Sequence, residues 1–385
     1  MLKGKLLRVS IVLIALFTAT IYFVTNNRVD TLMESSISAK VNDISKMGLT
    51  IINSRYIGSW KVKGNELYVG LKQASGLSDI LDEIKEKTGA HISIYFADEK
   101  VATSEVDKNG KRPLGGRVSS DVVISVLGKG ADYEGTEKIF GEQYAVKYMP
   151  LRDKDGKIIG MWSVAVSKAS VGKQRIQIIA MRASIVVISI LCGIIGCIIL
   201  LFFIKKFLSD IDTLKVSFLE SNKNNNKTQQ RVISLTLVLI FTFFLIWFII
   251  QGYTVGNVVT NLANSNVKNR LDINLNLGYM LIDELYKGDW TVQEDKMYKG
   301  TVCLNDNTLV LNRVNTGGEY FLSFYMGDLS IVTNTSAYDT SKTIGTKVPS
   351  EVEDTVLKQG KEYTGEINVA DKKCIVKYIP LKDGS

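Results

Sequence analysis

The sequence has few of the residues that metal sites and nucleophilic active sites use. Among its 385 residues there is one histidine, His91, and there are only four cysteines. No stretch resembles a HExxH zinc motif, a P-loop, a nucleophile elbow or a Cys-x-x-Cys pair. We therefore predict neither an enzyme nor a metal site in this chain, and no cofactor.

Charged residues are also scarce, at 22%, while hydrophobic residues reach 46%. The apolar residues are concentrated in three segments, 6–24, 183–204 and 232–250, each close to the roughly 20 residues that a helix needs to cross a bilayer. We predict three transmembrane helices. A cleaved signal peptide is the alternative for the first segment, but it lacks a clear small-x-small cleavage site and leads directly into a helical pattern.

Basic residues flank these segments on one side. Lys3, Lys5 and Arg8 lie at the first segment, and the linker at 205–231 carries six more lysine and arginine residues. Short basic flanks are typical of the cytoplasmic side. The regions at 29–172 and 254–385 are therefore predicted to be extracytoplasmic, in a multi-pass protein of the cell membrane. The net charge of +8 is scattered over flanks and loops, which does not favour a nucleic-acid partner.

An internal repeat relates these two regions at an offset of 230 residues. Tyr56, Gly58, Trp60, Tyr68 and Gly70 recur as Tyr286, Gly288, Trp290, Tyr298 and Gly300. The same offset holds as far as the run 146–151, which recurs at 376–381. We call residues 29–172 the first module and residues 254–385 the second module.

Each module begins with a helical pattern and continues with short strands. Apolar residues recur at three- and four-residue spacings between Val29 and Ile52, which predicts a long helix. Strands are predicted at 66–69, 91–96, 144–149 and 158–166, and a short helix at 119–127, capped by Ser119 or Ser120. Trp60 and Trp290 are expected to close the core at the turn from helix to strand. The predicted fold class is α+β, with a long N-terminal helix and an antiparallel sheet in each module.

The second copy stops at Asp383-Gly384-Ser385, in the turn that precedes the closing strand of the first copy. We therefore expect the second module to be incomplete and the natural protein to continue. The first module has no cysteine, so the fold cannot depend on a disulfide. Whether Cys303 and Cys374 are bonded is left open.

Both modules resemble the single Cache domain of bacterial receptors. The resemblance rests on Gly58-Ser59-Trp60, the strand 92–96 leading to Val101-Ala102-Thr103, and Tyr148-Met149-Pro150-Leu151 before Asp155-Gly156. It is closer in the second module, with Gly288-Asp289-Trp290 and 344–348. The resemblance implies a PAS-like fold that binds small molecules outside the membrane, most often in methyl-accepting chemotaxis proteins.

This family context makes a chemoreceptor the leading functional hypothesis. The resemblance also implies a homodimer, and a cytoplasmic chemotaxis kinase complex as partner. Sensor histidine kinases and diguanylate cyclases remain alternatives, as does a surface binding protein without signalling. The linker at 205–231 is too short for the HAMP unit that usually follows such a module, so the first module has no output domain of its own.

Ligand-binding residues are expected on the sheet and its covering loops. Charge-assisted hydrogen bonds are the strong ones, so an anionic metabolite would need cationic and hydroxyl donors. The candidates are Tyr95, Thr103, Arg117, Tyr133 and Lys147 in the first module, and Tyr325, Thr333, Lys347, Tyr363 and Lys377 in the second. Alternation along the strand places Lys147 on the face opposite Val146 and Tyr148, so these residues cannot all line one pocket. His91 is interpreted as a surface or hydrogen-bonded histidine.

Overall fold

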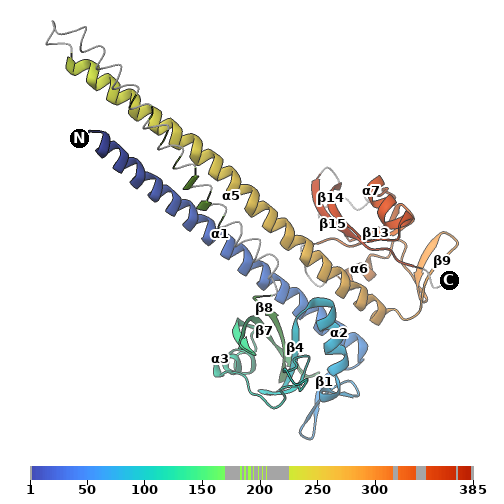
Figure 1. Ribbon diagram of the computed structural model, residues 1–385. Coiled ribbons are helices and arrows are strands. Elements are labelled where there is room, and N and C mark those ends of the chain that lie inside the picture. The colour runs from blue at the N-terminus through green and yellow to red at the C-terminus, as the bar shows by residue number, and fades with distance from the viewer. Residues whose placement is uncertain are drawn as a thin grey trace. The chain divides into compact units, whose positions relative to one another are not determined.

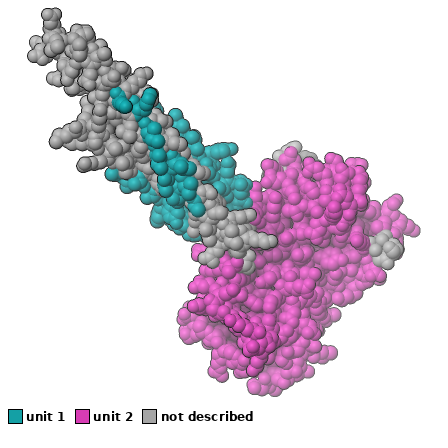
Figure 2. All heavy atoms as spheres, viewed as in Figure 1, with its two compact units in different colours: residues 1–33, 172–263 teal, residues 34–171, 264–385 magenta. Residues whose placement is uncertain are grey.

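A computed structural model describes residues 2–169, 225–314, 320–334, 344–369 and 372–382, with scattered residues between 183 and 205. The chain divides into two compact units, residues 1–33 with 172–263 and residues 34–171 with 264–385 (Figure 2). The predicted second membrane segment lies almost wholly outside the described residues.

Two long helices run through the first unit. Helix α1 is Leu2–Arg55 and helix α5 is Asn225–Leu285 (Figure 1). The predicted segments 6–24 and 232–250 lie within them, and Val29 of α1 packs against Leu262 of α5. Among the described residues, the stretch Leu245–Leu285 contains a window long and apolar enough to cross a membrane.

The second unit contains the bodies of both modules. The first module begins with β1 (Trp60–Lys63), β2 (Glu66–Val69) and β3 (Lys72–Gln73), followed by α2 (Ser78–Thr88). Strands β4 (His91–Phe96), β5 (Glu99–Thr103), β6 (Tyr133–Ile139), β7 (Glu142–Arg152) and β8 (Ile158–Ser167) form one antiparallel sheet in the order β5-β4-β8-β7-β6. The predicted strands at 66–69 and 91–96 are confirmed to the residue, and those at 144–149 and 158–166 lie within β7 and β8.

Helices cover both faces of this sheet (Figure 1). On one face α1 and α2 bury Ile92, Ile94, Trp162 and Val164. Trp162 is fully buried and donates a hydrogen bond from Nε1 to the carbonyl oxygen of Ser45 on α1, at 3.1 Å. The long helix is thereby tied to the central strand.

The other face lies under a short helix, α3 (Ser120–Val122), that continues as a π-helical segment, η2 (Val123–Gly128). Val122 and Val126 pack there against Tyr144, Val146 and Tyr148. Ser119 occupies the predicted cap position, but its side chain makes no capping hydrogen bond.

The second module repeats these elements. They are β9 (Trp290–Gln293), β10 (Lys296–Lys299), β11 (Val302–Cys303), α6 (Thr308–Val314), β12 (Ser323–Met326), β13 (Leu329–Thr333), α7 (Ser350–Val352), η4 (Glu353–Lys358), β14 (Tyr363–Val369) and β15 (Lys372–Tyr378). All described strand pairs are antiparallel. Cys303 and Cys374 are free thiols, so the disulfide left open by the sequence is not formed. Trp60 and Trp290 are both buried in the core, as predicted.

Candidate functional site

The candidate site is the polar part of the sheet face beneath α3 and η2. Strand registry places one residue from each strand in a single row across this face. In sheet order the row is Thr103, Ser93, Ser163, Tyr148 and Tyr133. The row consists of hydroxyl groups alone, although its members come from five strands.

Hydrogen bonds connect the hydroxyls at one end of the row. The Oγ of Ser93 lies 2.8 Å from Oγ1 of Thr103 and 3.3 Å from Oε1 of Glu105. All three residues are buried. A buried carboxylate needs a compensating partner, and Lys100 supplies it, because its Nζ lies 2.8 Å from Oε2 of Glu105.

The cation of Lys100 also lies 5.8 Å from the ring centroid of Tyr95. Burial opposes its charge, but Tyr95 and Glu105 together raise the pKa of Lys100 above its usual value. Lys100 therefore stays protonated at neutral pH while most of its side chain is covered.

Three tyrosines lie at the centre of the face. The ring centroids of Tyr95 and Tyr148 are 5.7 Å apart, and those of Tyr133 and Tyr148 are 6.2 Å apart. The hydroxyl of Tyr148 donates to both carboxylate oxygens of Glu137, at 3.0 and 2.9 Å. Burial raises the pKa values of Tyr95 and Tyr148, so both remain neutral donors.

Glu137 is the second carboxylate of the face. Burial raises its pKa above the usual range, although the hydrogen bond from Tyr148 opposes this effect. The nearest cation, Lys100, is already paired with Glu105. Glu137 therefore has no ion pair of its own among the described residues, and a ligand cation could complete it.

His91 lies at the edge of the same face. Its Nε2 is 3.3 Å from the hydroxyl of Tyr144, while its Nδ1 is buried without a hydrogen-bond partner. Burial, followed by the charge of Lys85, lowers the pKa of His91. His91 is partly exposed and hydrogen-bonded through Nε2, which agrees with its interpretation as a surface or hydrogen-bonded residue.

The structure places three of the predicted residues of the first module, Tyr95, Thr103 and Tyr133, on one face of the sheet, with Thr103 and Tyr133 on its two edge strands. Arg117 lies apart from them, with a side chain that is 71% exposed and 3.8 Å from Asp98. Lys147 lies on the opposite face, as its place in the strand implied. There its Nζ contacts Asn42 of α1 at 3.0 Å and Glu134 at 3.0 Å, which ties the sheet to the helix.

The second module shows the same division. Tyr325 and Tyr363 pack around Tyr378, with ring centroids 5.5 and 6.4 Å apart, and Ser323 donates to Thr333 at 2.8 Å. Lys347 is exposed beside Asp328. Lys377 forms ion pairs with Asp272 and Glu362, the counterparts of Asn42 and Asp132.

The charged groups of the face were missed from the sequence. At the repeat offset Lys100 corresponds to Ser330, Glu137 to Ile367 and His91 to Phe321. A search for repeated residues selects what the modules share and passes over these positions. Their signal is the reverse one, namely charged residues of one copy that the other copy replaces by neutral residues at the same offset.

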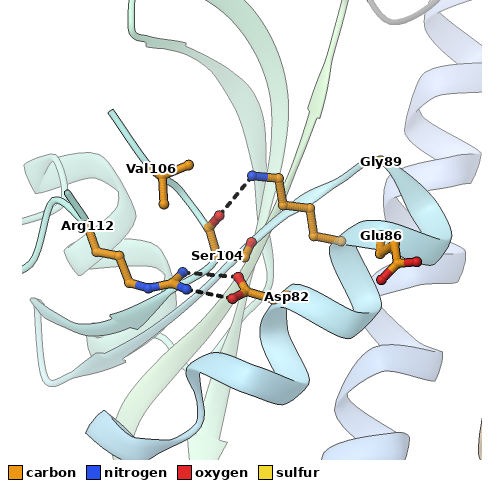
Figure 3. Close-up of a pocket in the computed structure, with 7 residues that line it drawn as sticks. Asp82, Glu86, Gly89, Ser104, Val106 and Arg112 are labelled. Carbon is orange, nitrogen blue, oxygen red and sulfur yellow. Dashed lines mark hydrogen bonds and ion pairs between the residues drawn. The ribbon is translucent and has the colours of Figure 1, made fainter. Parts of the chain in front are cut away.

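A second feature is an open depression of about 400 Å³ between α2 and the chain after β5 (Figure 3). Arg112 faces Asp82 across it, with Nη2 and Oδ2 2.5 Å apart (Figure 3). Arg112 also donates to the carbonyl oxygen of Thr103 at 2.6 Å. The Nζ of Lys85 donates to the carbonyl oxygen of Ser104 at 3.0 Å. Both cations thus fasten the loop to α2, which favours a structural role for this depression.

Within the part of the chain that the structure describes, no group of three or more histidine, cysteine, aspartate and glutamate side chains could hold a metal ion. The candidate site itself offers hydrogen-bonding groups, aromatic faces and the charges of Lys100, Glu105 and Glu137.

Comparison with known proteins agrees with the repeat. Residues 71–178 and 302–385 each match the family described as single Cache domain 3, whose members are non-catalytic ligand-binding modules. Among solved structures, the sensor domain of DcuS from E. coli matches with 12% identity and a TM-score of 0.23, covering 38% of this chain and 96% of that chain. None of the curated proteins compared with the chain matches it.

Proposed function

The chain contains two single Cache domains in tandem, and on that premise we propose that it is an extracellular sensory receptor that binds a small ligand at the tyrosine-rich face of the first module. The observation that carries the proposal is the group of three charged residues among three tyrosines, in which Glu105 is buried and Lys100 and Glu137 are partly buried. A module that only filled space would not need to bury charges at such a cost in free energy.

The charges of the face define the ligand class that we propose. The face has one cation, Lys100, and two carboxylates, Glu105 and Glu137. Because Lys100 is already paired with Glu105, the face carries an excess of negative charge. An anionic metabolite would be repelled by Glu137. An ammonium group would instead meet the carboxylate of Glu137 and the aromatic faces of Tyr95 and Tyr148, both of which attract cations. We therefore propose a small amine or a zwitterion such as an amino acid.

The covering segment supports this location. Both modules carry a π-helical segment over this face, η2 in the first and η4 in the second. Such segments are rare and often lie at functional sites. A cover held mainly by Val122 and Val126 could open for a ligand without disturbing the core on the other face.

The experiment is a thermal-shift screen of the full chain in detergent or nanodiscs, with amino acids, amines, dicarboxylates and neutral sugars as probes. The expected result is a rise in melting temperature with an amine or amino acid, lost in Glu137→Gln and Tyr148→Phe. Arg117→Ala is the matched control, because Arg117 is exposed away from the face. Stabilisation by dicarboxylates that survives Glu137→Gln would refute the ligand class.

We propose further that both modules face the outside of the cell. The three apolar segments and their basic flanks support this topology. Cys303 and Cys374, which are free and partly exposed, allow a direct test when Cys192 and Cys197 are replaced by serine. A membrane-impermeant maleimide should label intact cells, and labelling that requires permeabilised cells would place the second module inside.

The output that we propose is chemotactic, on the strength of the resemblance to receptors of that class. Cells that lack the gene should lose their swimming response to the stabilising ligand while keeping responses to other attractants. A normal swimming response, together with a ligand-dependent change in protein phosphorylation or in cyclic dinucleotide level, would favour a histidine kinase or a cyclase instead.

A further inference from the structure

The contacts between the two modules follow the internal repeat. Asp43 of α1 meets Arg270 and Asn274 of α5, at sequence separations of 227 and 231, and Arg55 meets Glu284 at a separation of 229. These values bracket the repeat offset of 230. The two helices are therefore parallel and in register along this interface, as two copies of one module related by an approximate two-fold axis would be.

The first polar contact is centred on Asp43, whose side chain is 9% exposed. Its Oδ2 accepts hydrogen bonds from Nε and Nη2 of Arg270, at 3.1 and 2.9 Å, and from Nδ2 of Asn274 at 3.2 Å. The charge of Asp43 also acts on Tyr320 of the second module, because burial and this carboxylate raise the pKa of Tyr320 to about 12. Two residues of the second module thus donate hydrogen bonds to one carboxylate of the first.

The second polar contact lies three turns further along the helices and has the opposite polarity. Glu284 of the second module is 7% exposed in its side chain and accepts from Nε and Nη2 of Arg55, at 2.7 and 2.5 Å. Arg55 also pairs with Glu83 of its own module at 2.8 Å. Each module therefore contributes one cation and one anion to the interface.

Apolar packing joins the two contacts. Ile44, Met47 and Ile51 of α1 belong to the same buried cluster as Leu277 and Leu281 of α5. A Cβ atom added to Gly278 would lie 4.0 Å from Cε of Met47. Gly278, which is the counterpart of Gly48, therefore lies within van der Waals contact of Met47 in the first module, while its nearest neighbour is Val314 of its own module.

These polar contacts are not symmetric under the repeat. At the offset of 230, Asp43 corresponds to Ile273, and Arg270 corresponds to Lys40. In the same way Arg55 corresponds to Leu285, and Glu284 to Ser54. The two-fold copies of both ion pairs are therefore absent, and each pair forms in one direction only.

Replacing the mixed pair by a pair of two like modules shows which pairing this asymmetry favours. In a pair of two second modules, Arg270 would face Ile273, and Glu284 would face Leu285 and keep only Lys287 of its own module as partner. In a pair of two first modules, Asp43 would meet Lys40, but Arg55 would face Ser54. Arg55 and Glu284 each keep a partner in their own module, Glu83 and Lys287, but only the mixed pair forms both ion pairs between modules, and this difference in charge pairing can direct partner choice.

We propose that the first and second modules of one chain form a heterotypic pair with each other, in preference to pairing between like modules of two chains. The receptor then needs no second chain to complete its sensory pair. A displacement of α1 would be read against α5 of the same molecule. This proposal does not depend on the ligand assigned above.

The test is cross-linking of the full chain in native membranes, with its four cysteines replaced by serine. Met47→Cys and Gly278→Cys are combined in one chain and treated with a short bis-maleimide. The expected product migrates as a monomer and yields a cross-linked peptide containing positions 47 and 278. Leu71→Cys with Gly278→Cys is the control and should give no such product, since Leu71 is 89% exposed and lies away from the helices.

Two further samples test whether modules of different chains pair with each other. Met47→Cys alone should give little covalent dimer, whereas a dimer linked at position 47 as the main product would overturn the proposal. Coexpressed chains that carry Met47→Cys and Gly278→Cys separately should also give little dimer. A strong dimer band there would mean that the mixed pair forms between two chains.

A charge reversal provides a readout that does not rely on the glycine substitution. Asp43→Arg should lower the yield of the intramolecular product several-fold, because it places like charges together. Adding Arg270→Asp to the same chain should restore the yield. No loss with the first change, or no recovery with the second, would contradict the proposed role of this ion pair.

Discussion

Among the single-residue features, the ion pair of Lys100 and Glu105 should be the most sensitive to substitution. Lys100→Met would leave Glu105 buried beside Ser93 without its cation, and we expect a loss of about 2 to 3 kcal/mol in the free energy of unfolding. The double variant Lys100→Met with Glu105→Gln should recover most of this loss, because no buried charge remains. Denaturant unfolding of the three proteins measures both effects, and an equal loss in the double variant would show that packing and not charge is responsible.

His91 should make stability depend on pH. Its pKa is lowered in the folded state, mainly by burial, so the unfolded state binds the proton more tightly. Its contribution to stability is therefore present above the usual histidine pKa of about 6.5 and is lost as the pH falls towards the folded value. His91→Phe copies Phe321 of the second module and should weaken the fall in melting temperature between pH 7 and pH 5. An unchanged pH profile would assign the acid sensitivity to other groups.

At the scale of elements, the turn from the long helix into β1 and β2 is built identically in both modules. Gly58 has a φ of 128°, and a Cβ atom there would lie 2.8 Å from Cα of Gly70. Gly70 has a φ of 56° and lies against the carbonyl oxygen of Ile57. Gly288 and Gly300 repeat this arrangement. Backbone contact, rather than the turn alone, explains why these glycines recur.

Gly70→Ala should therefore cost about 2 to 4 kcal/mol, from positive φ and from overlap with backbone atoms that cannot move aside. Gly64→Ala is the control, because Gly64 has a φ of 60° but nothing within 4 Å of the added Cβ atom. Its cost should be about 1 kcal/mol. Thermal unfolding compares the two, and equal costs would mean that the contact of Gly70 with the carbonyl oxygen of Ile57 is not a constraint.

Element types followed from the sequence where one physical signal was strong. Alternation of apolar residues fixed 91–96 as a strand, and three- and four-residue spacing fixed the long helix. The segment after Ser119 was predicted as helical, but its π-helical form in Val123–Gly128 was not. That form depends on how the segment fits over the sheet, and local propensity contains no information on this fit.

The candidate site was predictable only in part. Tyr95, Thr103 and Tyr133 were found because the modules share them, whereas Lys100, Glu105 and Glu137 belong to the first module alone. Arg117 and Lys147 were chosen for their charge. Arg117 instead lies in an exposed ion pair with Asp98, and Lys147 lies on the helix-facing side of the sheet. Charge in a sequence does not show which partner neutralises it, since that partner comes from a distant element.

The difference between the modules has a consequence for the whole molecule. The second module keeps Ser323, Thr333 and the tyrosines but replaces the charges by Ser330 and Ile367. A ligand that needs Glu137 would bind the first module only. The second module then serves as the partner against which α1 is held, which is the role that its one-directional ion pairs with Asp43 and Arg55 support.

This role predicts measurable coupling between residues 227 positions apart. A double-mutant cycle of Asp43→Ala and Arg270→Ala in the full chain should give a coupling of about 1 to 3 kcal/mol, because one carboxylate with little exposure collects the guanidinium and an amide. The cycle of Asp328→Ala and Lys347→Ala is the control, since that ion pair is also short, at 2.7 Å, but has a lysine that is 73% exposed and lies within one module. Solvent screening should make its coupling much smaller. Small coupling energies for both pairs would mean that the two modules do not stabilise each other in solution. A large coupling energy for the first pair alone would show that the stability of each module depends on its contact with the other.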